Sequence, residues 1–185
     1  MQHPKKVTNL ILDFFQTSAN LKKIPRQGWS DKLCIDNPES VADHTFSMAI
    51  MGMIFSDLEN YNTEKILKII LLHDLAESIT SDMTPEQISK EEKTKLENSV
   101  IKKILNDLPT ILQKQYSVLW NEYQSNNSKE AKIVHQLDRL EMALQAKIYY
   151  NEGYPKEKLN IFFNSARNEI KDPKLSELFR KILEK

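Results

Sequence analysis

The sequence is poor in the residues on which several classes of protein depend. It has one cysteine, Cys34, among 185 residues, which excludes an internal disulfide and with it a secreted, disulfide-stapled module. It has only three glycines and carries neither a P-loop nor a dinucleotide-binding fingerprint. Any nucleotide chemistry must therefore use side chains and a metal ion.

Long apolar runs and an excess of one charge are also missing. No run approaches the roughly 20 apolar residues that a membrane helix needs, and Asp13 interrupts the short apolar stretch near the N-terminus, which is not typical of a signal peptide. The formal net charge is zero, which argues against a nucleic-acid scaffold with a basic surface. We therefore expect a cytoplasmic protein with no membrane and no nucleic acid as partner.

Apolar residues make up 40% of the chain and recur at helical spacing through most of it, which predicts an all-α fold. Residues 1–185 are expected to form a single domain, with a core over about 10–150 and C-terminal helices over about 155–185. Helices are expected over residues 6–18, 40–58, 63–79, 84–107, 111–123 and 130–151, and after Pro155 and Pro173. Residues 21–38 lack this periodicity, and a long irregular segment in a helical domain is often functional.

Three of the predicted helices carry ionisable residues on their apolar sides. His44 lies in the apolar stripe of its helix, and Asp138 lies on the core side of the long helix 130–151. His73, Asp74 and Glu77 end a helix that is apolar nearly all round. Buried charges are costly unless they are paired or bind a metal. Two imidazoles and two carboxylates suit manganese, iron, cobalt or zinc, whereas the alternative is a set of hydrogen-bonded core histidines and capping or ion-paired aspartates.

These residues follow the order of a known signature. His44, His73-Asp74 and Asp138 resemble the H…HD…D pattern of the HD-domain superfamily of metal-dependent phosphohydrolases. The surrounding motifs resemble the branch that contains the bacterial 5′-deoxynucleotidases of the YfbR type and the human HD-domain-containing protein 2. Those motifs are K-K-I-P-R-Q-G-W at 22–29, P-E-S-V-A-D-H at 38–44, L-L-H-D-L-A-E at 71–77 and Q-L-D-R-L-E-M at 136–142. The resemblance covers roughly residues 10–150.

The resemblance implies an all-α HD-domain bundle that removes the 5′-phosphate from deoxyribonucleoside monophosphates. It implies one divalent metal ion (Mn, Co, Fe or Zn), with ligands His44, His73, Asp74 and Asp138. Deoxyribonucleoside monophosphates are then the substrate partners. The family often forms homodimers, which the apolar helical faces permit.

The resemblance also implies four further site residues. Glu77 and Asp82 are the acidic residues at the reaction centre, and Arg26 and Trp29 correspond to an arginine and a tryptophan that contact substrate. In the bacterial pattern those two are adjacent, whereas here two residues separate them, and a glycine of that pattern is replaced by Ser81.

The chemistry suits these residues independently. Glu77 lies four residues after His73 and three after Asp74, so it shares the metal-facing side of that helix and can orient or deprotonate the water. Asp82 can protonate the leaving 5′-oxygen, and the two roles can be interchanged. Arg26, one of four arginines, suits bidentate phosphate recognition, and its alternative is an ion pair. Trp29 can close over the sugar or fill the core.

Other charged residues are interpreted as structural or peripheral. The charge-rich stretch 89–95 is expected to be a solvated helix face. His135 is expected at a helix surface position, and His3 in a disordered terminus.

Two other functions fit the signature. The first is an HD phosphohydrolase acting on a cyclic dinucleotide, a dinucleoside polyphosphate or an alarmone. The second is a catalytically silent metal-binding interaction module, against which the presence of both Glu77 and Asp82 argues. Turnover of dAMP with manganese or cobalt separates these functions.

Overall fold

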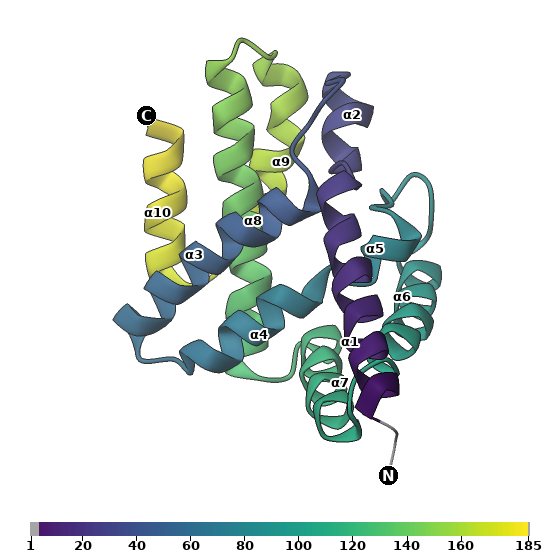
Figure 1. The fold of residues 1–185 in the computed structure, drawn as a ribbon. Coiled ribbons are helices and arrows are strands. Elements are labelled where there is room, and N and C mark those ends of the chain that lie inside the picture. Colours follow the sequence, from purple (N-terminus) through teal and green to yellow (C-terminus); the bar gives the residue numbers. More distant parts are fainter. Residues whose placement is uncertain (1–3, 185) are drawn as a thin grey trace.

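The long helix α8 runs through the middle of the molecule, and α3, α4, α7, α9 and α10 pack against it (Figure 1). The computed structural model describes residues 4–184, and no strand occurs in that range. The all-α prediction is therefore confirmed, while His3 lies outside the described residues. The elements are α1 (Pro4–Ala19), η1 (Asn20–Lys23), α2 (Gln27–Leu33), α3 (Val41–Glu59), α4 (Thr63–His73), α5 (Glu77–Thr80), α6 (Lys90–Leu105), α7 (Thr110–Ser125), α8 (Lys129–Asn151), α9 (Lys156–Glu169) and α10 (Pro173–Glu184).

Side-chain caps explain where several helices begin. Ser40 and Asp43 form the predicted capping box at the start of α3. The predicted helix start at Thr84 is wrong, because residues 85–87 form only a turn and α6 begins after Ser89. Ser89 and Glu92 form a second capping box, in which each side chain satisfies a backbone N–H that would otherwise lack a partner.

The predicted helix over residues 63–79 is interrupted. α4 ends at His73, Asp74 has φ −109° and ψ 10°, and the short helix α5 begins at Glu77. Adjacent residues inside a helix do not face each other. The break allows His73 and Asp74 to direct their side chains to one point, with Nε2 and Oδ2 3.1 Å apart.

The segment 21–38 is more regular than predicted, since it contains η1 and the helix α2. The Arg26 N–H donates to the Glu39 carbonyl at 2.9 Å, and the Val41 N–H donates to the Ile24 carbonyl at 2.9 Å. These bonds tie the segment just before α2 to the start of α3. They therefore fix Arg26, the N-cap residue of α2.

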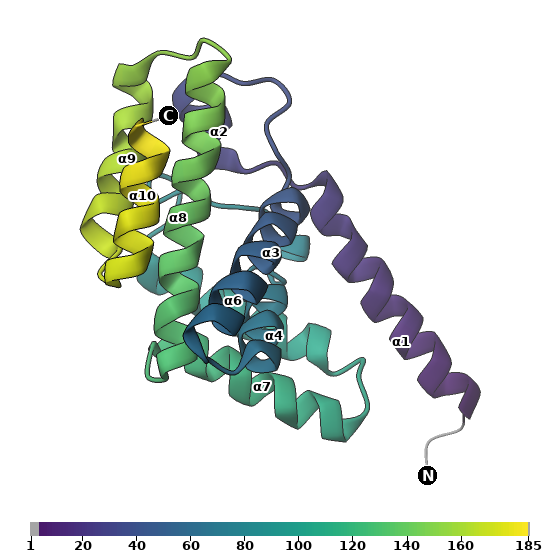
Figure 2. The ribbon, with the colours of Figure 1, turned by 90° about the vertical axis from the view of Figure 1, so that its left-hand side faces the viewer.

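A close crossing brings together α3, which carries His44, and α4, which carries His73. A Cβ atom on Gly52 would lie 2.4 Å from Cδ1 of Ile70 and 3.1 Å from Cγ2 of Ile66, so glycine at this position leaves room for these two side chains of α4. α8 packs against both helices, with α9 and α10 on its other side (Figure 2). Within the described part of the chain, no helix is long and apolar enough to cross a membrane.

Candidate metal and phosphate site

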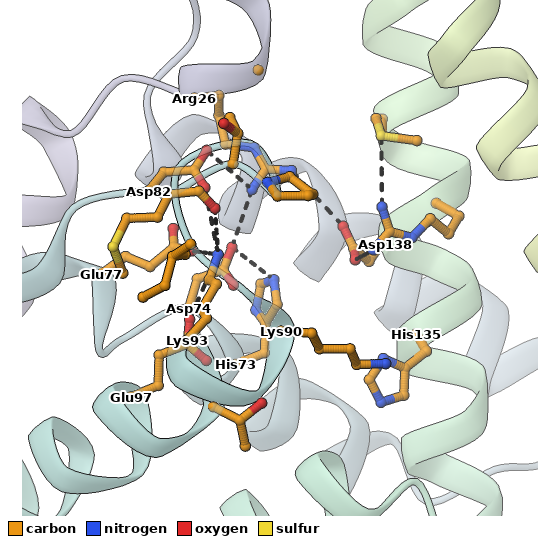
Figure 3. A pocket seen from close by; sticks show the side chains of 18 of the residues that line it. Arg26, His73, Asp74, Glu77, Asp82, Lys90, Lys93, Glu97, His135 and Asp138 are labelled. Atoms are coloured by element: carbon orange, nitrogen blue, oxygen red, sulfur yellow. Dashed lines mark hydrogen bonds and ion pairs between the residues drawn. The ribbon is translucent and has the colours of Figure 1, made fainter.

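A cavity of about 490 Å³ collects most of the site residues that the sequence predicts. Its lining includes Arg26, Trp29, His73, Asp74, Glu77, Asp82 and Asp138. The labelled side chains of α4, α5, α6 and α8 point toward one another around it (Figure 3). His44 is fully buried, and its Nε2 lies 3.4 Å from Oδ1 of Asp138.

The two histidines are held in orientations that leave one ring nitrogen of each unused. Nδ1 of His73 donates to the Ile70 carbonyl at 2.6 Å, and Nδ1 of His44 lies 2.5 Å from Oε2 of the buried Glu141. Both Nε2 atoms are buried and lack a hydrogen-bond partner among the described residues. A ring oriented through Nδ1 with a free Nε2 is the usual arrangement of a metal-binding histidine.

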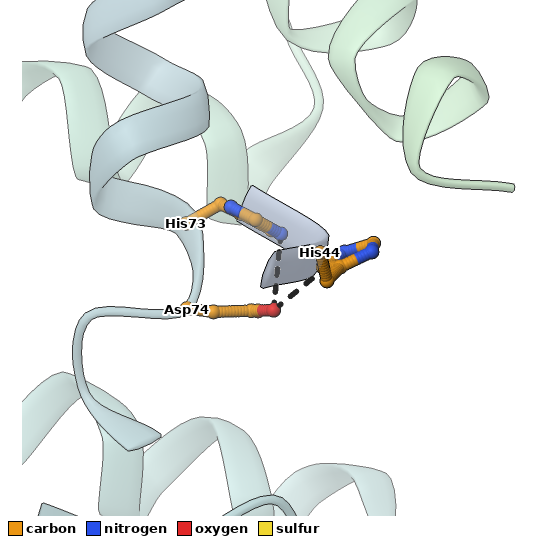
Figure 4. A group of neighbouring side chains, drawn as sticks. All are labelled: His44, His73 and Asp74. Atoms are coloured by element: carbon orange, nitrogen blue, oxygen red, sulfur yellow. Dashed lines mark ion pairs between the residues drawn. The ribbon is translucent and has the colours of Figure 1, made fainter. Parts of the chain in front are cut away.

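Two carboxylates complete this group. Oδ2 of Asp74 lies 3.1 Å from Nε2 of His73 and 3.9 Å from Nε2 of His44, and both rings approach it in Figure 4. Ligand atoms of these three residues all lie within 4.8 Å of one another. Burial by itself raises the pKa of Asp74, but His73, Arg26 and His44 outweigh it and hold the pKa well below its usual value. The donors, two free imidazole nitrogens with Asp74 and Asp138, fit a divalent transition-metal cation.

Arg26 reaches across the acidic side chains of the cavity. Its Nη1 lies 3.5 Å from Oδ2 of Asp74 and 3.9 Å from Oδ2 of Asp82, and its Nη2 lies 4.0 Å from Oδ1 of Asp138. Burial lowers the pKa of Arg26, but the three aspartates outweigh it and raise the pKa above its usual value. The guanidinium is therefore cationic, and its long contacts leave donors for an anion.

Glu77 lines the cavity, but the expectation that it lies on the same helix as His73 is wrong. It does not continue α4 but is the first residue of α5, after the break at Asp74. Only 2% of Glu77 is exposed, and its Oε2 lacks a hydrogen-bond partner within the described chain. Burial, followed by the charges of Asp74 and Asp82, raises the pKa of Glu77 well above its usual value.

Asp82 is positioned by a strained turn and by α2. Ser81 stands where the bacterial pattern has glycine, and it adopts φ 65° and ψ 166°, a region that residues with a Cβ atom rarely enter. Oδ2 of Asp82 accepts a hydrogen bond from the Gln27 N–H at 2.9 Å. Ser81 thus adopts a backbone conformation with positive φ, which glycine adopts most easily, and the next residue, Asp82, lines the cavity.

Trp29 is mainly a core residue. It is 2% exposed and its ring contacts Tyr149 and Phe162, with centroids 5.2 and 4.1 Å away. Its Nε1 donates to Oε1 of Glu39 at 2.8 Å. The residue borders the cavity, but its burial favours the alternative interpretation as core rather than a ring closing over the sugar.

The structure adds site residues that sequence reasoning missed. Lys93 of α6 lies in the cavity lining and contacts Glu77, so the stretch 89–95 is not only a solvated face. His135, predicted at a helix surface position, is half-buried on α8. Its ring stacks on Tyr123 with centroids 4.1 Å apart, its Nε2 donates to the Tyr123 carbonyl at 3.0 Å, and it lines the cavity.

The helical bundle and its buried histidine–aspartate centre define an HD-domain protein. The family model described as "HD domain" matches residues 18–179, and the chain belongs to this family. The resemblance to the HD superfamily is therefore confirmed, and the matched range extends past residue 150 into α9 and α10.

Comparison with individual proteins shows which members of the HD-domain family this chain is similar to. The human protein named 5′-deoxynucleotidase HDDC2 is 37% identical over 169 residues, covering 91% of this chain and 82% of the relative. The Dictyostelium discoideum protein of the same name is 38% identical, covering 90% of this chain and 93% of the relative. Among solved structures, the PH0347 protein from Pyrococcus horikoshii OT3 superposes with a TM-score of 0.77 at 31% identity, covering 92% of this chain and 97% of the other.

Proposed function

We propose that this protein is a metal-dependent 5′-deoxynucleotidase, which hydrolyses the 5′-phosphate of deoxyribonucleoside monophosphates. The observation that carries the proposal is the pair of buried, unpartnered Nε2 atoms of His44 and His73 beside Asp74 and Asp138. These four residues are the proposed ligands of one divalent cation. The names of the human and Dictyostelium relatives support the substrate class.

The chain's own residues account for the steps around the phosphate. A bound divalent cation neutralises phosphoryl charge and lowers the pKa of the water that it coordinates. Water attacks phosphorus and the bond from phosphorus to the 5′-oxygen breaks. Glu77 accepts a proton from the attacking water through its free Oε2, and Asp82 in its protonated form gives a proton to the leaving 5′-oxygen, so that one proton is taken up and one is released in each turnover; the two roles can be interchanged. The products are inorganic phosphate and a deoxyribonucleoside.

Substrate positioning is assigned to the segment around α2. Arg26 binds the phosphate, because its guanidinium faces the proposed metal ligands and its contacts with them are long. Trp29 supports the wall of the cavity against which the sugar packs. A rigid wall of this kind displaces a ribonucleotide from alignment when a 2′-hydroxyl is present.

The test is a phosphate-release screen over deoxyribo- and ribonucleoside monophosphates with manganese, cobalt, iron and zinc. We expect turnover of dAMP that exceeds turnover of AMP and that is abolished by EDTA. Turnover of a cyclic dinucleotide, a dinucleoside polyphosphate or an alarmone in preference to dAMP would reassign the substrate. No turnover of any of these compounds would support a silent metal-binding module.

The ligand assignment is tested separately from activity. His73→Ala removes one free Nε2, and we expect it to lose the metal measured by elemental analysis after gel filtration. His135→Ala is the matched control, because that ring lies in the same cavity but its Nε2 is already bonded to the Tyr123 carbonyl. Full metal occupancy in folded His73→Ala protein would remove His73 from the ligand set.

We also propose that a second copy of the chain covers the outer face of α3. Phe46, Ile50 and Ile54 recur every four residues on this helix and are 70%, 42% and 53% exposed. Such a stripe can form the apolar centre of a homodimer interface. Light scattering should give twice the chain mass of 21.6 kDa, and Phe46→Asp should restore the single-chain mass. Ile111→Asp on α7, where Ile111 is 77% exposed, is the control. An unchanged dimer in Phe46→Asp would exclude this face.

The proposed compartment is the cytoplasm. Cys34 is free and exposed, and an exposed thiol suits a reducing compartment. Fractionation of the source cells tests this placement.

A further inference from the structure

The ammonium group of Lys93 lies where α5, the loop before α6 and α6 itself meet, and each of these segments contributes an acidic residue near it. Its Nζ lies 3.1 Å from Oε1 of Glu77 on α5 and 3.1 Å from the carbonyl oxygen of Met83 in the loop before α6. It also lies 3.7 Å from Oδ1 of Asp82 and 3.6 Å from Oε1 of Glu97. The ammonium group lies among these carboxylates in Figure 3. One cation thus connects both of the proposed proton-transfer residues.

We propose that Lys93 is a positioning residue for Glu77, whose Oε1 it fixes so that Oε2 stays available to the attacking water. The assignment rests on the proposed function and adds to it a residue outside the HD signature. Glu77 is 2% exposed and its two oxygens are used differently. Oε1 accepts from Lys93, whereas Oε2 has no hydrogen-bond partner within residues 4–184.

The donors of Lys93 are committed to the protein rather than to a phosphate. An ammonium group has three N–H donors. Two of them have acceptors at 3.1 Å, and two further carboxylate oxygens lie within 4 Å. Arg26, by contrast, has five donors, and its contacts with the site's carboxylates begin at 3.5 Å. Arg26 is therefore free to bind phosphate, while Lys93 is not.

The burial of these side chains and the shortness of α5 explain how Lys93 can hold the orientation of the Glu77 carboxylate. Its side chain is 27% exposed, compared with 2% for that of Glu77 and 11% for that of Asp82. α5 has only four residues, so it has little rigidity of its own. Removing the ammonium leaves the Glu77 carboxylate free to rotate, and a misplacement of about 1 Å can cost roughly 10²-fold in rate.

The experiment compares Lys93→Met, Lys93→Arg and Lys95→Met. Methionine keeps the approximate length of the side chain without the charge, arginine keeps the charge, and Lys95 is an exposed residue of the same helix that makes no ion pair among the described residues. With dAMP and saturating manganese, we expect kcat of Lys93→Met to fall about 10²-fold while KM stays near the wild-type value. Lys93→Arg should recover part of kcat, and Lys95→Met should match wild type.

A double-mutant cycle with Glu77→Gln separates positioning from direct binding. If Lys93 acts through Glu77, Lys93→Met should have little further effect on kcat in the Glu77→Gln background, whereas independent effects multiply. Inhibition by inorganic phosphate should be unchanged in Lys93→Met. Multiplying effects, or weakened phosphate inhibition with a raised KM, would overturn the proposal and make Lys93 a phosphate ligand.

The contact itself can be tested without turnover. The free energies of unfolding of the same four proteins of the cycle, measured in urea, should be non-additive if Lys93 and Glu77 are paired. Wild-type protein without nucleotidase activity but with this coupling would refute the proposed function and retain the pairing. Additive stabilities, or normal kcat in folded Lys93→Met, would refute the role of Lys93 while leaving the function in place.

Discussion

Replacement of Glu141 should weaken metal binding although Glu141 is not a proposed ligand. Its Oε2 lies 2.5 Å from Nδ1 of His44, and it is 2% exposed. It lies on α8, one turn after Asp138, so one helix supplies both a proposed ligand and the group that orients another. Its carboxylate keeps the Nδ1 proton in place and directs the free Nε2 of His44 to the cavity.

The magnitude follows from what each replacement removes. Glu141→Leu removes the acceptor, so the imidazole can rotate or change tautomer. Loss of such an outer-shell partner typically reduces metal affinity 10–100-fold, which corresponds to about 1.4–2.7 kcal/mol. Glu141→Gln keeps an acceptor oxygen and loses only the charge, so its loss of affinity should be smaller. Metal affinity should therefore decrease in the order wild type, Glu141→Gln, Glu141→Leu. The first step measures the contribution of the charge of Glu141, and the second measures the contribution of its hydrogen bond to His44.

The affinity of the protein for the metal ion should also depend on pH. Burial lowers the pKa of His44 and the charge of Arg26 lowers it further, but the neighbouring carboxylates of Asp138 and Glu141 outweigh both and raise the pKa to about 9. A proton must then leave His44 when a metal binds. Apparent affinity should rise with pH up to about 9, by roughly tenfold per pH unit for one released proton. Glu141→Leu removes the hydrogen bond from Nδ1 that raises the pKa and should flatten this rise near neutral pH.

The assay is isothermal titration of the metal-free protein with Mn²⁺ between pH 6.5 and 8, in two buffers of different ionisation enthalpy to count protons. Thermal melts without metal establish that each variant is folded. Glu152→Gln, an exposed residue at the end of α8, is the control. Wild-type affinity in folded Glu141→Leu protein would refute the orienting role, and a pH-independent affinity in wild type would refute the proton displacement.

Four further outcomes are expected. Glu77→Ala should retain manganese and substrate but lose about 10²–10⁴-fold in kcat, and near-normal turnover with metal bound would make Glu77 only a support. Arg26→Ala should raise KM for all monophosphates while binding manganese more tightly in calorimetry, because a cation 3.5 Å from Asp74 is removed; weaker metal binding would contradict this. Ser81→Gly should stabilise the fold by about 1–3 kcal/mol in urea unfolding, and a destabilised variant would show that the turn is not strained. Trp29→Ala should lower the free energy of unfolding by about 3–5 kcal/mol, and an unchanged ratio of kcat/KM for dAMP and AMP in the folded variant would exclude Trp29 from selecting the sugar.

The apolar periodicity predicted the buried histidines because periodicity and burial share one cause. A residue on the apolar side of a helix faces the core whatever its chemistry, and so His44, His73 and Asp138 are buried as expected. The same argument, extended along α6, would have found Lys93. Lys93 and Glu97 continue the stripe of Ile101 and Ile104, which are buried. The density of charge in residues 89–95 concealed this stripe.

The break after His73 could not be predicted by the same rule. The run from Thr63 to Ile79 has an uninterrupted helical pattern, and neither proline nor glycine marks the end of α4. What stabilises the non-helical conformation of Asp74 is a set of partners from distant segments, including Arg26, 48 residues away. Tertiary ion pairs of this kind outweigh local propensity, which is a weak determinant, and they are invisible in a single window of sequence.

Two of the cations that line the cavity, Arg26 and Lys93, contact different acidic residues. Arg26 lies against Asp74 and Asp138, the acids proposed to bind metal, whereas Lys93 lies against Glu77, and Asp82 is within 4 Å of both. Arg26 and a bound metal ion would compete for the negative charge of Asp74 and Asp138. An incoming phosphate brings further negative charge, so Arg26 is suited to move from these aspartates onto the phosphate. Lys93 has no such competitor and can remain in place through turnover. The mobile role therefore falls to the guanidinium and the fixed role to the ammonium, which is why variants of Arg26 should alter KM and variants of Lys93 should alter kcat.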